Sequence, residues 1–319
     1  MDIKDLIVRY GLVFPRRFYP KEKLRFLRGL AQEFHDAGMK VDIKEARKNQ
    51  RKAYNIYAGD IDRAGLTISA YYDTPPKTFG LIKHYVFCPK RDGIEFMLSL
   101  LAPYLVVIAA AALYSNFILM PILSDNSFTY MDVLASVPIL ILLLSLMYFR
   151  NGAGNKPNLV RNSAAIIVCV KLTESLKAKE LNRISMAFTD YGCVNHYGDK
   201  MLKDALAGNA GRNTVIFLDC VGGSGDVIVL YSGACSGHIE KIRQTAPDNV
   251  VFYEIAADNA HYYSLFNKSI ILTSGKMKNS MATADYVNTS KDNNINEENL
   301  NTSIDILKRL TSTYMTASK

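Results

Sequence analysis

The sequence predicts an α/β protein with a mostly parallel sheet, interrupted by a two-helix transmembrane hairpin. The α/β part is predicted because short β-favouring runs alternate with apolar residues at helical spacing on both sides of the hairpin. The hairpin is predicted by two long stretches without a charged residue, Phe96 to Leu123 and Val133 to Phe149. The first stretch is long enough to cross a bilayer with some tilt, and the second is close to the minimum spanning length.

Composition narrows the classes of protein and compartment. The chain has 319 residues, of which 49% are hydrophobic and 21% charged, and a net charge of +8. Its basic residues are spread along the chain without a nucleic-acid-binding motif, so we expect no nucleic acid partner. The five cysteines are odd in number and lack a Cys-x-x-Cys pair, which favours a reducing compartment. The first residues lack the apolar core of a signal peptide, so no cleaved leader is expected.

The first elements lead to a strand end that carries an aspartate. A helix is predicted from Pro20, with Gly38 able to supply its left-handed cap. Short strands are expected at 41–43 and 54–58, joined by a basic turn over 44–52. A further short run, Leu66 to Ser69, must stop before two consecutive prolines. The chain therefore places Asp73 at the carboxyl edge of the sheet, where ligands and catalytic groups collect in open α/β folds.

Charges around the hairpin predict its orientation. The connecting segment 124–132 carries two acidic residues and no Lys or Arg. Basic residues flank the hairpin on both outer sides: Lys83, Lys90, Arg91, Arg150, Lys156 and Arg161. By the positive-inside rule we expect an integral membrane protein with two transmembrane helices and cytoplasmic N- and C-termini. The predicted division is a discontinuous globular domain, 1–92 and 150–319, and a transmembrane helical hairpin, 93–149.

The α/β rhythm resumes after the hairpin. A buried helix is expected over 159–179, followed by a strand over 183–189 and a strong central strand, 214–218, that ends in Asp219. Further strands are predicted at 227–231, 250–255 and 270–273, and an amphipathic helix at 297–314. This alternation predicts a sheet covered by helices on both faces.

Six short segments, in order, resemble the motifs of the di-zinc aminopeptidases, the zinc exopeptidase family that includes a transferrin-receptor domain. Residues 69–74 read Ser-Ala-Tyr-Tyr-Asp-Thr, whereas the family's first metal motif reads Ser-Ala-His-Tyr-Asp-Thr. Segments 152–165 and 188–198 resemble the second and third motifs, and 217–222 resembles the fourth. Segments 257–263, with Asp258, and 286–292 resemble the last two. The resemblance implies a three-layer zinc-exopeptidase-like fold.

The resemblance also implies which groups are missing. In the family two histidines, two aspartates and a glutamate hold two zinc ions, and a second glutamate activates water. The residues here are Tyr71 and Asn288 at the histidines, Asn155 (or Pro157) at the bridging aspartate, and Gly192 and Cys193 at the two glutamates. Only Asp219 keeps a competent ligand, and Asp73 has lost the histidine it would orient. We therefore expect no metal, no cofactor and no peptidase catalysis.

Cysteine and histidine residues at the same edge of the sheet offer an alternative chemistry. Cys193 with His196, or Cys220 beside Asp219, could form a thiolate metal site or a Cys/His nucleophile. The simpler interpretation is that both cysteines are small buried residues and His196 is a loop histidine. His84 receives the same structural interpretation.

Two function classes follow. The first is a membrane-anchored, catalytically inactive peptidase-like protein, a peptide-binding or scaffold module for a membrane partner such as a transporter. The alternative is an active membrane-bound metallo-aminopeptidase with relocated zinc ligands. In the first class Asp73, Asp219 and Asp258 would cluster without a metal and attract an α-amino group or a lysine, with Tyr71, Tyr72 and Asn288 as hydrogen-bonding neighbours. A collapsed pocket whose carboxylates are satisfied by backbone donors is the other possibility.

Overall fold

The computed structural model describes residues 1–48, 51–78, 83–125, 129–149, 153–209, 211–256 and 265–317. In these residues the strands form one sheet with the order β1-β2-β5-β3-β6-β9-β10-β4, and β7 pairs with β8 and β9. The strands are β1 Val41–Lys48, β2 Arg51–Ala58, β3 Leu66–Tyr71, β4 Lys83–Tyr85, β5 Ile184–Thr189, β6 Thr214–Leu218, β7 Asp226–Ser232, β8 Val250–Ile255, β9 Ser269–Lys278 and β10 Met281–Asp285.

The sheet is parallel at its centre and antiparallel toward its edges. Strands β5, β3, β6 and β9 run parallel to one another, as do β7 and β8. The pairs β1/β2, β2/β5, β7/β9, β9/β10 and β10/β4 are antiparallel. The expected α/β fold is therefore present, with a mixed sheet whose parallel part is its core. Both faces of these central strands are apolar and buried, since Ile216 of β6 lies in one core and Val215 and Phe217 lie in another.

Helices cover both faces of the sheet. They are α1 Ile3–Val8, α2 Pro20–Asp36, α3 Pro89–Tyr114, α4 Met120–Asp125, α5 Tyr130–Phe149, α6 Ala164–Ser175, α7 Ala178–Leu181, α8 Tyr197–Ala205, α9 Ser236–Arg243 and α10 Glu297–Ala317. Short π-helical turns occupy Arg9–Val13, Ser115–Leu119 and Leu159–Ser163, and 3-10 turns occupy Ala207–Asn209 and Gly233–Cys235. One core lies between the sheet and α1, α2, α6, α9 and α10, and a second, against α8, contains Leu202, Leu206 and Phe217.

The prediction of a basic turn over 44–52 is wrong, because residues 44–48 belong to β1 and residues 51–52 belong to β2. Strands β1 and β2 continue as an antiparallel ribbon until Lys48 pairs with Arg51. Charged residues suit this exposed ribbon because they face solvent and pair across strands, as Lys52 does with Glu45 at 2.9 Å.

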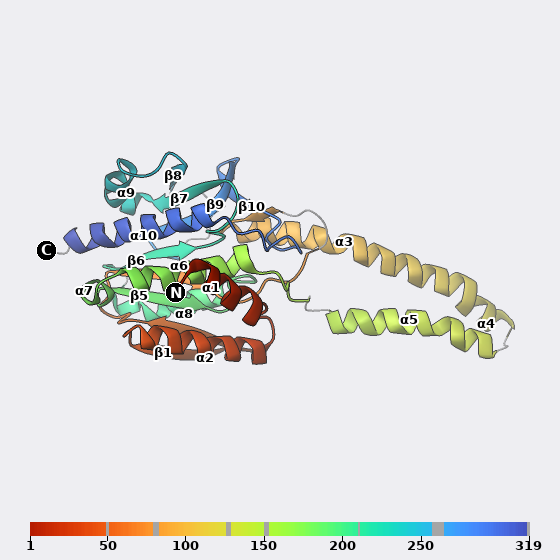
Figure 1. Ribbon diagram of the computed structural model, residues 1–319. Coiled ribbons are helices and arrows are strands. Elements are labelled where there is room, and N and C mark those ends of the chain that lie inside the picture. Colours follow the sequence, from red (N-terminus) through yellow and green to blue (C-terminus); the bar gives the residue numbers. More distant parts are fainter. Residues whose placement is uncertain are drawn as a thin grey trace.

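The inserted segment forms two long apolar helices that project side by side from one end of the globular body (Figure 1). Tyr114 and Ser136 join α3 to α5 through a hydroxyl hydrogen bond of 2.9 Å. One helix, Pro89–Ser124, is long and apolar enough to cross a membrane, and only 7% of its most apolar stretch is buried. The second apolar helix, Tyr130–Ser145, is shorter than that criterion requires.

Candidate functional site

Asp73 and Asp219, which the motif segments single out, follow neighbouring strands at the same edge of the sheet. Ala70 of β3 lies opposite Leu218 of β6 in a parallel register, so Asp73 and Asp219 follow the carboxyl ends of adjacent strands. Both side chains are buried. The prolines after β3 and the buried run of β6 thus bring together the two acids that the sequence placed at this edge.

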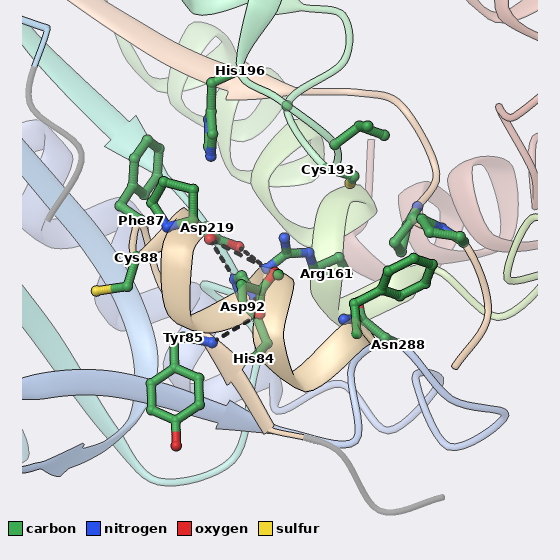
Figure 2. Close-up of a pocket in the computed structure, with 17 residues that line it drawn as sticks. His84, Tyr85, Phe87, Cys88, Asp92, Arg161, Cys193, His196, Asp219 and Asn288 are labelled. Carbon is green, nitrogen blue, oxygen red and sulfur yellow. Dashed lines mark hydrogen bonds and ion pairs between the residues drawn. The ribbon is translucent and has the colours of Figure 1, made fainter. Parts of the chain in front are cut away.

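Two cationic side chains and a tyrosine surround the Asp219 carboxylate, and Figure 2 shows the two cationic side chains, Arg161 and His84. Arg161 Nη1 lies 3.2 Å from Oδ1 and 3.4 Å from Oδ2. His84 Nε2 lies 2.9 Å from Oδ2, and the Tyr71 hydroxyl donates a short hydrogen bond to Oδ1.

His84 joins this cluster to the first turn of α3. Its Nδ1 lies 2.8 Å from Asp92 Oδ1, while its Nε2 faces Asp219. A neutral imidazole has one N–H donor, and two carboxylate partners therefore favour the imidazolium with two. Burial and Arg161 lower the pKa of His84, but the carboxylates of Asp92 and Asp219 outweigh them and raise it above its ordinary value. The cluster thus contains two cations and two anions.

The pKa of Asp219 reflects this compensation. Burial alone would raise it, but the Arg161 guanidinium and the His84 imidazole hold the pKa of Asp219 well below its usual range. Burial raises the pKa of the Tyr71 phenol well above its ordinary value, so the hydroxyl stays protonated and donates. The expectation of an uncompensated Asp219 is therefore wrong.

Asp73 is held by backbone instead of by cations in direct contact. The Gly192 N–H donates to Asp73 Oδ1 at 2.8 Å, and the Cys193 N–H lies 3.3 Å from both oxygens. Burial raises the pKa of Asp73 to about 6, while the positive charge of Lys23 and the backbone N–H groups oppose the rise. Backbone donors thus satisfy this carboxylate, as one of the two alternatives supposed.

The turn that carries Gly192 leaves no room for a larger residue. A Cβ atom at Gly192 would lie 2.2 Å from the Cβ of Tyr71, far inside van der Waals contact. Every residue except glycine at position 71 has that Cβ. A glutamate at 192 could not stand here, as a catalytic base would in the family, unless the backbone moved.

Three other predicted positions make local hydrogen bonds, and one of them, Asn288, also lines a small cavity beside the cluster. Asn155 is fully buried and donates from Nδ2 to the carbonyls of Pro157, at 2.6 Å, and Thr289, at 2.9 Å. The carbonyl of Asn288 accepts from the Thr78 N–H at 3.0 Å. Tyr72 donates from its hydroxyl to the Tyr54 carbonyl at 3.0 Å. Asp258 lies outside the described residues.

The cysteines near the site are protonated thiols. Burial raises the pKa of Cys193 and that of Cys220 well above the ordinary value. Cys193 Sγ donates to the Asp73 carbonyl at 3.0 Å, and Cys220 Sγ lies 3.1 Å from Asp219 Oδ1. Because the thiolate is the reactive form, neither residue is poised as a nucleophile.

A small cavity opens beside the cluster, between the strand ends and the start of α3. Its volume is about 120 Å³. Arg161, Asp219 and His84 line one part, and the α3 residues Asp92, Gly93 and Phe96 line another. The cavity therefore lies at the base of the apolar hairpin.

The zinc ions implied by the resemblance do not fit these residues. Donor atoms of His84, Asp219 and Cys220 do lie within 4.8 Å of one another. However, Arg161 Nη1 contacts Asp219 and lies 3.9 Å from Cys220 Sγ, so a permanent positive charge already stands among the donors. A zinc ion would have to displace that guanidinium and deprotonate the thiol.

Sequence reasoning missed the cationic half of the site. Arg161 reads as a hairpin flank and His84 as a structural histidine, but the structure buries both against Asp219. The available signals were weak. Arg161 lies in an otherwise apolar helical run, and His84 precedes Tyr-Val-Phe, a β-favouring run that becomes β4 and its exit.

Solved structures resemble this chain over nearly its whole length. A Zn-dependent exopeptidase from Parabacteroides distasonis has a TM-score of 0.53 and 14% identity, covering 98% of this chain and 95% of that one. A glutaminyl cyclase from Porphyromonas gingivalis has a TM-score of 0.54 and 14% identity, covering 99% and 96%. A leucine aminopeptidase precursor from Bacteroides thetaiotaomicron has a TM-score of 0.50 and 13% identity, covering 98% and 94%.

These likenesses show a zinc-exopeptidase-like fold, as the motif order predicted. No family model matches the sequence, and no curated protein does. At such identities the likeness concerns the fold alone, and the chemistry must be argued from the residues at the strand ends.

Proposed function

We propose that this protein is a membrane-anchored, non-catalytic protein of zinc-exopeptidase-like fold that acts as a scaffold for a membrane partner, such as a transporter. One observation carries the loss of catalysis: the Arg161 guanidinium contacts the carboxylate of Asp219, the single competent ligand that the resemblance leaves. With His84 it supplies the positive charge that metal ions would otherwise bring. The close approach of Gly192 to Tyr71 supports the proposal, because it leaves no space for a general base.

The membrane anchor rests on the inserted helices. We propose that the 93–149 hairpin crosses the bilayer twice, with both termini on the cytoplasmic side. Long exposed apolar side chains cover the hairpin, including Leu105, Ile108 and Ile141, each more than half exposed. Such a surface is stable in lipid and is a liability in water. The acidic connecting loop and basic flanks support the orientation.

Peptide binding in the cavity has less support than partner binding by the hairpin. The cavity of about 120 Å³ is smaller than the roughly 300 Å³ at which small-molecule pockets begin. In addition, Arg161 and His84 already compensate Asp219, so that carboxylate does not require an α-amino group. We therefore assign partner binding to the hairpin and the adjacent surface.

The alternative, an active metallo-aminopeptidase with relocated ligands, is favoured by one observation, the grouping of His84, Asp219 and Cys220. The two functions make opposite predictions about metal. We expect the purified full chain to hold far less than one zinc per molecule after zinc loading and dialysis. We also expect no chelator-sensitive release of amino acids from peptide amides.

Arg161→Met sharpens this measurement because it removes the guanidinium while keeping an apolar side chain of similar length. Arg183→Met, at an exposed arginine, is the matched control. Zinc bound by Arg161→Met and not by the control would identify the guanidinium as the group that excludes metal. One zinc per native chain together with chelator-sensitive hydrolysis would establish the active enzyme instead.

A further inference from the structure

The globular surface next to the hairpin carries six basic side chains, which we call the basic collar. They are Lys77, Lys83, Lys90, Arg91, Lys156 and Lys291. Five are exposed and Lys83 is half-buried. They come from four separate segments of the chain, so the collar is a product of the fold and not a basic run in the sequence.

Contacts place these segments around the base of the hairpin. Lys90 and Arg91 lie in the first turn of α3, and Lys83 lies on β4, which packs against that helix. The Lys77 N–H donates to the carbonyl of residue 153 at 2.7 Å, beside the segment that follows α5 and contains Lys156. Asn155 of that segment binds the Thr289 carbonyl, two residues from Lys291.

The collar's charge is largely uncompensated. In the part of the chain that the structure describes, none of the six forms an ion pair, whereas Lys23 and Lys52 do. Two acidic residues lie near the collar. Asp285 of β10 lies opposite Lys83 of β4, and Glu95 lies on α3. Asp92 belongs to the buried His84 pair. The surface therefore keeps a net positive charge directly beside an apolar hairpin.

The helix register gives the depth of the collar relative to a bilayer. Tyr114 of α3 is level with Ser136 of α5 because their hydroxyls meet. Helix α5 has 20 residues, so it spans about 30 Å, the thickness of a hydrocarbon core. Counting from the Tyr114 contact, the globular-side end of α5 is level with approximately Leu101. Lys90 and Arg91 then lie roughly 15 Å beyond the hydrocarbon. This is about one Debye length, about 8 Å, outside a headgroup layer roughly 5–7 Å thick.

We propose that the basic collar binds the headgroups of anionic lipids. The proposal rests on the membrane anchoring proposed above, and it adds a lipid class that the anchor alone does not specify. Each lysine or arginine at such a surface contributes about 1 kcal/mol of attraction to anionic lipid, equivalent to about 5-fold in affinity. The collar would hold the globular body against the cytoplasmic leaflet and keep the cavity at the headgroup level.

The test measures lipid preference of the full chain. Purified protein in mild detergent is titrated with phosphatidylglycerol or phosphatidylcholine, and bound lipids are counted by native mass spectrometry. The collar variant combines Lys77→Gln, Lys90→Gln and Lys156→Gln. The matched control combines Lys177→Gln, Lys179→Gln and Lys241→Gln, three exposed lysines at or beside α7 and α9, at the end of the body away from the hairpin (Figure 1).

We expect the native chain to prefer phosphatidylglycerol, the collar variant to lose at least about 10-fold of that preference, and the control to keep it. High salt should weaken the preference. Equal binding of both lipids by the native chain, or equal loss in both variants, would overturn the proposal. Competition by inorganic phosphate at constant ionic strength would do the same, since it would indicate a free-phosphate site.

Anchoring is read separately, from alkaline extraction of membranes that contain the native chain. If the membranes retain the chain but it shows no lipid preference, lipid binding by the collar is wrong and membrane anchoring is supported. If the chain is extracted, co-sedimentation with vesicles is the next measurement. Selective binding to phosphatidylglycerol vesicles, lost in the collar variant, would support lipid binding by the collar and contradict the membrane anchor. If there is no selective binding, both proposals are wrong.

Discussion

Asp219 and Asp73 leave adjacent strands and are equally buried, yet their environments are opposite. Asp219 is surrounded by the side chains of Arg161 and His84, and its pKa is held well below the usual range. Asp73 accepts hydrogen bonds from the backbone of Gly192 and Cys193, and burial raises its pKa to about 6. Direct contact with cations therefore decides how strongly the fold favours the charged form of a carboxylate at this edge.

The difference follows the roles that the resemblance implies for the two residues. Asp219, at the position that resembles the family's metal ligand, is paired with Arg161 and His84. Asp73, at the position that resembles the residue orienting a histidine, accepts hydrogen bonds from the turn after β5. Substitutions at the two sites should therefore differ in size and in pH dependence.

The largest effect is expected for Asp219→Asn. This change leaves Arg161 and His84 buried without their shared counter-charge, which should lower the free energy of unfolding by about 3–5 kcal/mol. Denaturant unfolding of the full chain in detergent measures it. Asp305→Asn, which removes the exposed partner of Arg309, is the control and should have a small effect. Similar costs for both variants would mean that the buried cluster contributes little.

Asp73→Asn should change how stability depends on pH. Because the folded pKa of Asp73 is about 6, above the ordinary aspartate value of about 3.8, its contribution to stability is present at low pH and is lost as pH rises through about 6. The lost contribution amounts to about 3 kcal/mol between pH 4 and 6. We expect the native chain to lose stability over this range relative to Asp73→Asn, as measured by unfolding at a series of pH values. Parallel profiles for the two proteins would show that Asp73 is charged in the fold throughout.

Gly192→Ala tests the backbone that holds Asp73. The new Cβ would meet the Cβ of Tyr71, so we expect a cost of about 2 kcal/mol in the free energy of unfolding. Gly208→Ala, where an added Cβ meets nothing within 4 Å, is the matched control. Tyr71→Ala should not rescue the variant, because alanine keeps the obstructing atom. Recovery of stability in the double variant would show that the added Cβ clashes with the ring of Tyr71 instead.

The anionic half of the site could be predicted from sequence and the cationic half could not. Asp73 and Asp219 follow apolar runs that end at prolines or a glycine turn, which local patterns reveal. Arg161 has the same local appearance as a flanking arginine of a transmembrane helix. Its burial depends on how the turn at Leu159–Ser163 brings it against Asp219, just after β6, which is tertiary information. His84 sits on a three-residue strand that forms only by pairing with β10.

The fold shows the same division between local and tertiary information. The α/β frame and the central parallel strands follow from periodicity, whereas the continuation of β1 and β2 into the predicted turn over 44–52 does not. Its charged residues look like a turn until Glu45 and Lys52 meet across strands. Edge strands can be polar because one face is solvated, and sequence pattern alone then loses the strand signal.

The contact between positions 71 and 192 also constrains redesign of the site. A glutamate at position 192 requires a Cβ where the Cβ of residue 71 stands, and a histidine at position 71 keeps that obstacle in place. A design that adds both side chains must therefore also rebuild the turn that carries Gly192.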